Sequence, residues 1–159
     1  MQVRIRETGA VMYEGEFRAL YPNTSFSQQI SAETLDAFGA DVVFEGPQAT
    51  GGDVYQYSQA SGVELVDGKW FTKHILGPVF IDGETTAAEQ EAAYKTAKDA
   101  YQANSVRTSR NDKLKECDWT QVLDAPVDQT VWATYRQALR DISSQDGFPW
   151  EITWPTQPE

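Results

Sequence analysis

The residue types that most often carry out catalysis are sparse in this chain. There is one histidine, His74, and one cysteine, Cys117, among 159 residues. His74 falls in an aromatic and aliphatic stretch with no second histidine to complete a metal site, and no spacing of the many carboxylates singles out an acid and a base. The only Gly-Gly pair, Gly51-Gly52, is followed by neither a Lys-Ser/Thr pair nor a helix, unlike a phosphate-binding loop. We therefore expect no enzymatic activity, no cofactor and no metal ion.

The charge balance bears on the kind of partner. The net charge is −11, and a strongly acidic chain repels the phosphates of nucleic acids. No apolar run reaches the roughly 18 residues of a membrane span, and the first residues lack the apolar core of a signal peptide. We expect neither nucleic acid nor membrane as a partner, and a cytoplasmic protein. The lone Cys117 suits a reducing compartment, where it is expected to be a buried residue at a helix end or, alternatively, a reactive thiol.

Composition divides the chain into three parts and indicates the α+β class. We expect a small β-rich head at residues 1–83, a long connecting helix at 84–118, and a helical docking module with an extended tail at 119–159. The three parts carry net charges of −6, −1 and −4. A chain of this length allows one ordinary domain or two small ones joined by an extended element, and the composition favours two.

Short β-prone runs separated by turn residues predict a small antiparallel sheet in the head. The expected strands are residues 3–5, 11–13, 42–44, 54–57, 63–66 and 70–76, with 79–81 as a last strand or a linker. Asp67-Gly68 is a hairpin signal between the fifth and sixth of them. One short helix is expected from Ala32 to Phe38, with Ser31 as its N-cap. Glu14-Gly15-Glu16 is expected to be a turn, and residues 17–26 an irregular packed segment.

The absence of Gly and Pro between Thr85 and Asp118 predicts a helix of about thirty residues. Thr85 or Thr86 can cap its start, and Lys113 and Lys115 favour its negative end. A break near Asn104-Ser105 is left open. Its apolar stripe is thin and rich in alanine, so another helix could approach closely, including that of a second copy. A solvated linker helix without a partner is the alternative.

A dense aromatic pattern marks the last forty residues. Trp132, Tyr135, Leu139 and Ile142 recur at helical spacing after Pro126 and Asp128, so they share one helix face. Trp119 and Trp132 are expected either to form a local core with the preceding helix or to contact a partner. Trp150 and Trp154 lie in a proline-punctuated strap, residues 148–159, for which core packing and partner contact are equally open. Deleting residues 149–159 is expected to leave the head and the long helix folded.

These elements follow one another in an order that resembles a known family. The chain contains, in sequence, Asp118-Trp119, Asp124-Ala125-Pro126, Trp132-x-x-Tyr135-x-x-Ala138-Leu139 and Trp154-Pro155-Thr156-Gln157-Pro158. This order resembles the tail fibre assembly proteins and tail assembly chaperones of tailed bacteriophages. The resemblance is strongest over residues 105–159, whereas over the head only the general layout is similar.

The resemblance implies a chaperone that binds the carboxy-terminal region of a tail fibre or adhesin, expected to be trimeric, and assists its folding and trimerisation. It implies action in the host cytoplasm during assembly, with association with the virion tail left open. Arg136 and Arg140 are expected to form an exposed edge. The full set of predicted partner-binding residues is Trp119, Trp132, Tyr135, Arg136, Leu139, Arg140, Trp150, Trp154 and Pro155.

Two alternatives stay open. In the first, the protein is a structural virion component at the fibre tip or baseplate. In the second, the head is a carbohydrate-binding module, suggested by its aromatic residues Tyr21, Phe26, Tyr55, Tyr57 and Trp70.

Overall fold

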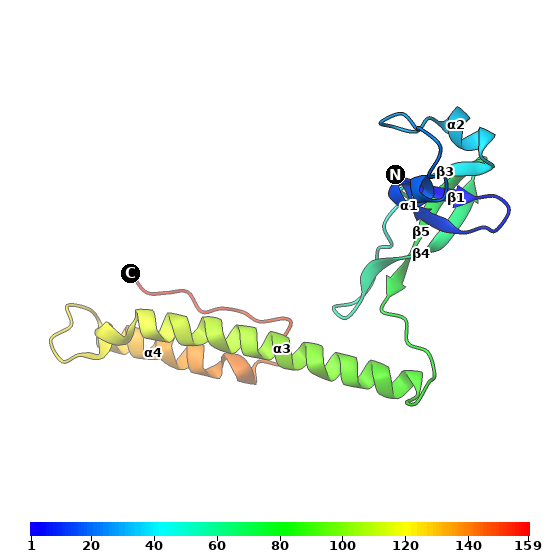
Figure 1. Ribbon diagram of the computed structural model, residues 1–159. Coiled ribbons are helices and arrows are strands. Elements are labelled where there is room, and N and C mark those ends of the chain that lie inside the picture. Colours follow the sequence, from blue (N-terminus) through cyan, green and yellow to red (C-terminus); the bar gives the residue numbers. More distant parts are fainter. The chain divides into compact units, whose positions relative to one another are not determined.

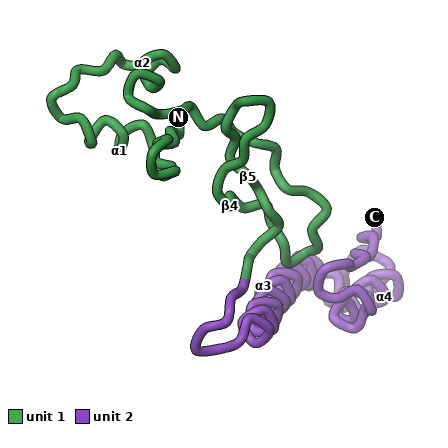
Figure 2. Tube along the Cα trace, turned by 90° about the vertical axis from the view of Figure 1, so that its right-hand side faces the viewer, with its two compact units in different colours: residues 1–79 green, residues 80–159 purple.

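The computed structural model describes residues 1–159, which fold as two compact units, Met1–Val79 and Phe80–Glu159 (Figure 2). Unit 1 is a sheet with short helices, and unit 2 is helical (Figure 1). Each unit has its own buried apolar cluster. The predicted α+β class is therefore confirmed. None of the helices combines the length and apolar character needed to cross a membrane.

The sheet of unit 1 has five strands in the order β2-β1-β3-β5-β4. The strands are β1 (Gln2–Ile5), β2 (Val11–Tyr13), β3 (Ala40–Phe44), β4 (Tyr57–Val66) and β5 (Lys69–Gly77). The prediction of a purely antiparallel sheet is wrong in one pairing, because β3 and β5 are parallel while the other three pairs are antiparallel. The second strand of the β4–β5 hairpin, β5, pairs with β3. The alternation of apolar and polar residues within a strand does not determine which strand becomes its neighbour.

The turn between β4 and β5 confirms the hairpin signal. Asp67 and Gly68 both have positive φ, 47° and 74°, as a two-residue type I′ turn requires. Of the predicted strand at 54–57, only Tyr57 belongs to β4, and residues 79–81 form a linker rather than a strand.

Two short helices pack on the sheet, where one was predicted. Helix α2 (Ala32–Ala37) begins as expected at Ser31, whose hydroxyl accepts the Thr34 N–H. Helix α1 (Glu14–Ala19) replaces the predicted turn at residues 14–16 and part of the predicted irregular segment. An Arg18–Glu14 ion pair of 2.6 Å spans one turn of α1, and Phe17 is fully buried. This tertiary burial stabilises a helix of low intrinsic propensity that contains Gly15.

Helix α3 (Ala87–Glu116) is a continuous helix of 30 residues, so no break occurs near Asn104-Ser105. Thr86 is its N-cap and forms a capping box with Glu89: the Thr86 hydroxyl accepts the Glu89 N–H, and the Glu89 carboxylate accepts the Thr86 N–H. Lys113 and Lys115 lie in its last turn, as predicted.

The remaining elements of unit 2 return along α3. They are the 3₁₀ turn η1 (Asp118–Gln121), helix α4 (Gln129–Arg140) and the 3₁₀ turn η2 (Asp141–Ser144), followed by the extended strap. Asp128 caps α4 by accepting the Thr130 and Val131 N–H groups. Figure 1 shows α4 lying beside the carboxy-terminal half of α3.

Candidate functional site

The inner face of α4 forms the core of unit 2. Trp132, Tyr135 and Leu139 are 4 %, 6 % and 0 % exposed and cluster with Val106 of α3 and with Cys117. The Trp132 and Tyr135 rings meet edge to face at 5.8 Å. Burial raises the pKa of Tyr135 above its ordinary value. The expected packing of Trp132 on the preceding helix is confirmed, and these three side chains offer little surface to a partner in this conformation.

Arg136 is buried, so its predicted position on an exposed edge is wrong. Its Nη1 donates to the Leu114 carbonyl at 2.8 Å and to Cys117 Sγ at 3.0 Å, and its Nη2 donates to Asp118 at 2.8 Å. Position 136 is four residues after Trp132, so it shares the inner face, and the long side chain reaches the Leu114 carbonyl in the last turn of α3. Burial lowers the pKa of Arg136, but the bonds to Asp118 and Cys117 outweigh it and the pKa is raised.

Arg140 is exposed in the last turn of α4. The two arginines therefore do not form one edge, because Arg136 turns inward towards the end of α3. Cys117 is 2 % exposed and donates its S–H to the Leu114 carbonyl, so its predicted position as a buried residue at a helix end is confirmed.

The strap is fastened to the rest of unit 2. Trp150 Nε1 donates to Asp99 of α3 at 2.6 Å, and Ile152 and Trp154 pack against the core cluster. The Gln145 side chain bonds both backbone groups of Thr153, as a neighbouring strand would. The strap therefore covers core side chains, and the folding of the head and of α3 without residues 149–159 stays a prediction. Pro155 is half-buried in the strap and lines a shallow apolar groove against α4.

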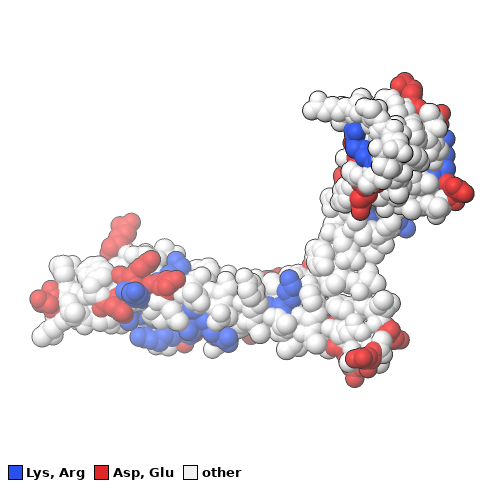
Figure 3. Space-filling view, viewed as in Figure 1, with Lys and Arg blue, Asp and Glu red and all other residues white.

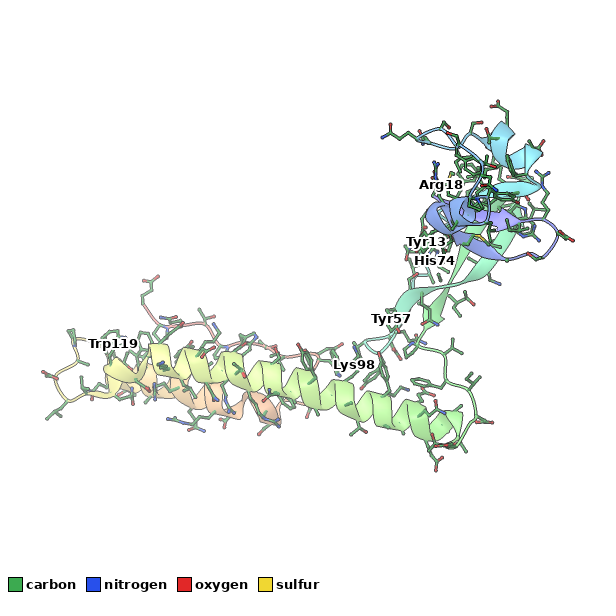
Figure 4. The ribbon with its side chains drawn as sticks, viewed as in Figure 1. Tyr13, Arg18, Tyr57, His74, Lys98 and Trp119 are labelled. Carbon is green, nitrogen blue, oxygen red and sulfur yellow. The ribbon has the colours of Figure 1, made fainter.

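Exposed apolar side chains gather in the segment that runs from the end of α3 into the first turn of α4. We call residues 117–131 the connection. Trp119, Val122, Leu123 and Val131 are 50 %, 52 %, 98 % and 48 % exposed. Figure 4 places Trp119 at this end of the helix pair. Sequence analysis selected only Trp119 of the four. The available signal was an aliphatic pair, Val122-Leu123, inside a loop where polar residues are the norm.

The connection is also acidic. Glu116, Asp118, Asp124 and Asp128 fall in or beside it, and no Lys or Arg occurs between Glu116 and Val131. Asp118 is paired with Arg136, and Asp128 caps α4. Figure 3 shows red acidic side chains at this end of the helix pair, with blue basic side chains close by. The segment therefore presents apolar side chains bordered by negative charge.

The aromatic residues of the head do not form one exposed group. Tyr21 and Phe26 join Phe17 and Phe38 in a cluster of rings under α1 and α2. The Arg4 guanidinium lies 4.0 Å from the Trp70 ring centroid. Of the five aromatic residues, only Tyr57 is exposed. This arrangement gives no support to the carbohydrate-binding alternative, which needs rings side by side on the surface.

His74, the one histidine, lies on β5 with its side chain 7 % exposed and its Nε2 3.1 Å from Glu45 Oε1. Gln48 lies within 3.2 Å of the same nitrogen. No group of three or more His, Cys, Asp or Glu side chains is arranged to hold a metal ion. His74 therefore ties the segment after β3 to strand β5.

Residues 103–159 match the family described as phage tail assembly chaperone protein. No curated protein and no solved structure matches the chain. The match confirms the family resemblance, which rested on the motifs of residues 105–159, and it supports a role in tail assembly. It spans the second half of α3, the connection, α4 and the strap, whereas unit 1 lies outside it.

Proposed function

We propose, from the premise that residues 103–159 have the pattern of phage tail assembly chaperones, that this chain binds the carboxy-terminal region of a tail fibre or adhesin and assists its folding and trimerisation. The observation that carries the proposal is that the residues matched by the family pack together around the core of unit 2. The matched residues include every member of the unit 2 core cluster, from Val106 to Trp154. The family pattern therefore belongs to a structured docking module.

The physical need for such a module comes from how fibre trimers form. Interwoven chains expose strand edges and apolar surface before they close on one another, and both promote aggregation. A chaperone that covers this surface reversibly needs exposed apolar side chains on a soluble body. The connection supplies them, and the net charge of −11 favours solubility.

The proposed activity is binding, without catalysis, and it takes place in the host cytoplasm while the fibre folds. Of the predicted partner-binding residues, Trp119 and Arg140 are exposed, while Trp150, Trp154 and Pro155 are half-buried. The buried members, Trp132, Tyr135, Arg136 and Leu139, would act by shaping the module. Contact between any of these residues and a fibre stays a prediction.

Co-expression tests the function directly. The fibre gene of the same phage genome would be expressed alone, with this chain, and with an unrelated acidic protein at the same level. We expect soluble trimers, measured by size-exclusion chromatography and by SDS-resistant bands, only with this chain. Full trimer yield from the fibre alone would remove the assembly role.

A structural virion component is the second candidate. The observation in its favour is unit 1, a separately folded sheet that lies outside the family match and is available for another attachment. Mass spectrometry of purified particles decides between the two. One copy or more per fibre supports the structural role, and absence supports transient action.

A further inference from the structure

The connection concentrates the exposed apolar surface of unit 2. Six large apolar side chains of this unit are exposed, and four of them, Trp119, Val122, Leu123 and Val131, fall within the connection. The other two, Ile81 and Tyr101, stand apart from the connection in the sequence. Single exposed apolar residues are normal on soluble proteins, whereas a group of them marks an interaction site.

The backbone that carries this group is held in place. The Gln129 side chain donates to the Val122 carbonyl at 2.7 Å, and the Thr120 hydroxyl donates to the Cys117 carbonyl at 2.7 Å. The Trp119 ring lies 6.1 Å from the ring of buried Trp132. The exposed side chains therefore project from an ordered segment, so binding costs less conformational entropy of the connection than it would if the connection were a flexible loop.

The charges beside these side chains restrict the partner. Asp118 and Asp128 have partners within unit 2, but Glu116 and Asp124 have no ion-pair partner there. Glu116 precedes the apolar group in the sequence, and Asp124 lies within it, directly after Leu123. A partner that covers the apolar side chains partly desolvates these two carboxylates. Desolvating an unpaired charge is costly, so the partner must bring positive charge to the same place.

We propose that the connection is the surface that docks the fibre, and that it takes a fibre segment whose apolar side chains are flanked by Lys or Arg. This inference rests on the proposed chaperone function and adds the place and the chemistry of its contact. The buried face of α4 then supplies stability, and the connection supplies recognition. Attraction between the acidic rim and the basic flanks also makes the contact sensitive to salt.

Two substitutions on exposed residues test the surface without disturbing the core. Leu123→Asn removes the most exposed apolar side chain, and Asp124→Lys reverses the charge beside it. The matched controls are Leu65→Asn, at a side chain 57 % exposed in unit 1, and Asp146→Lys, at an exposed residue after α4. All four full-length variants should keep the wild-type melting temperature, because surface changes away from structural contacts usually cost under about 0.5 kcal/mol.

The readout is fibre co-purified with each variant after co-expression. We expect both connection variants to retain at least about tenfold less fibre, the scale of a hot-spot residue, and both controls to retain the wild-type amount. Full fibre retention and trimer yield with Leu123→Asn and Asp124→Lys would overturn the docking surface and leave the chaperone function standing. Trimers formed without any chaperone would instead defeat the function itself.

A second measurement tests the chemistry of the partner. Labelled peptides that tile the carboxy-terminal region of the same fibre would be titrated with the full chain and followed by fluorescence anisotropy. We expect the bound peptides to combine apolar residues with Lys or Arg, and to bind less tightly as salt is raised. Binding only to acidic or uncharged peptides, binding unchanged by Asp124→Lys, or binding to no peptide would overturn the inference.

Discussion

The two ends of helix α3 are held in different ways. The first turn is held by its own neighbours, because Thr86 and Glu89, three residues apart, bond each other's backbone N–H groups. The last turn is held from a distance, because Arg136, 22 residues after Leu114, donates to its carbonyl. Both devices satisfy backbone groups that a helix end leaves without partners. The local device depends on two residues, while the distant one depends on the folding of the whole helix pair.

The difference predicts how each end responds to substitution. Loss of the local cap should fray one turn, whereas loss of the distant anchor or of the core beneath it should affect all of unit 2. Four changes test this contrast, and they are ordered by the size of the expected effect.

Trp132→Ala should have the largest effect, because it empties the centre of the core cluster. Truncating a buried aromatic costs about 3–5 kcal/mol, which corresponds to a fall in melting temperature of more than about 10 °C for a unit of this size. Circular dichroism at the helical wavelengths measures it. Trp119→Ala, at a half-exposed ring in contact with Trp132, is the control and should cost much less. Equal losses would mean that the connection is part of the core.

Arg136→Ala should destabilise unit 2 by about 1–3 kcal/mol, since it removes bonds to the Leu114 carbonyl, Cys117 and Asp118. The loss is limited because Asp118 is 64 % exposed and regains water. Thermal melts compare it with Arg140→Ala, whose exposed side chain should matter by less than about 0.5 kcal/mol. A wild-type melt for Arg136→Ala would show that the end of α3 needs no distant anchor.

Thr86→Ala should cost about 1 kcal/mol, the usual worth of an N-cap, and the loss should be confined to the first turn of α3. Amide hydrogen exchange at residues 88–90 should accelerate while exchange at residues 132–139 stays slow. Thr85→Ala, at the neighbouring exposed threonine, serves as the control. Faster exchange throughout unit 2 would erase the contrast between the two ends.

Acid should loosen the same first turn, with the smallest effect of the four. The pKa of Glu89 is lowered, first by the Thr86 backbone N–H and then by its hydroxyl. Because the folded pKa lies below the unfolded one, ionised Glu89 stabilises the turn at neutral pH, and this contribution disappears as the pH falls through the folded pKa. Glu89→Gln should therefore reduce the acid-induced rise in amide exchange at residues 88–90. Glu84→Gln is the control, and an unchanged pH response with Glu89→Gln would contradict the assignment.

The sequence was most informative where the relevant contacts are local. The cap at Thr86, the hairpin at Asp67-Gly68 and the unbroken stretch before Asp118 all depend on residues a few positions apart. The helical spacing of Trp132 and Leu139 likewise identified the inner face of α4. These features follow from backbone geometry and side-chain period, which a linear sequence expresses directly.

The tertiary structure decided the features that the spacing of side chains along the sequence leaves open. The parallel pairing of β3 with β5 and the burial of Phe17 that stabilises α1 depend on which elements become neighbours. The inward turn of Arg136 is the clearest case, because a charged residue at a helical position is exposed by default and only the end of α3 gives it a buried site. In the same way, spacing marked the aromatic residues as a set, but only packing separated buried Trp132 from half-exposed Trp119. A linear pattern fixes the side of a helix on which a residue lies, whereas the element that covers that side is determined by the fold.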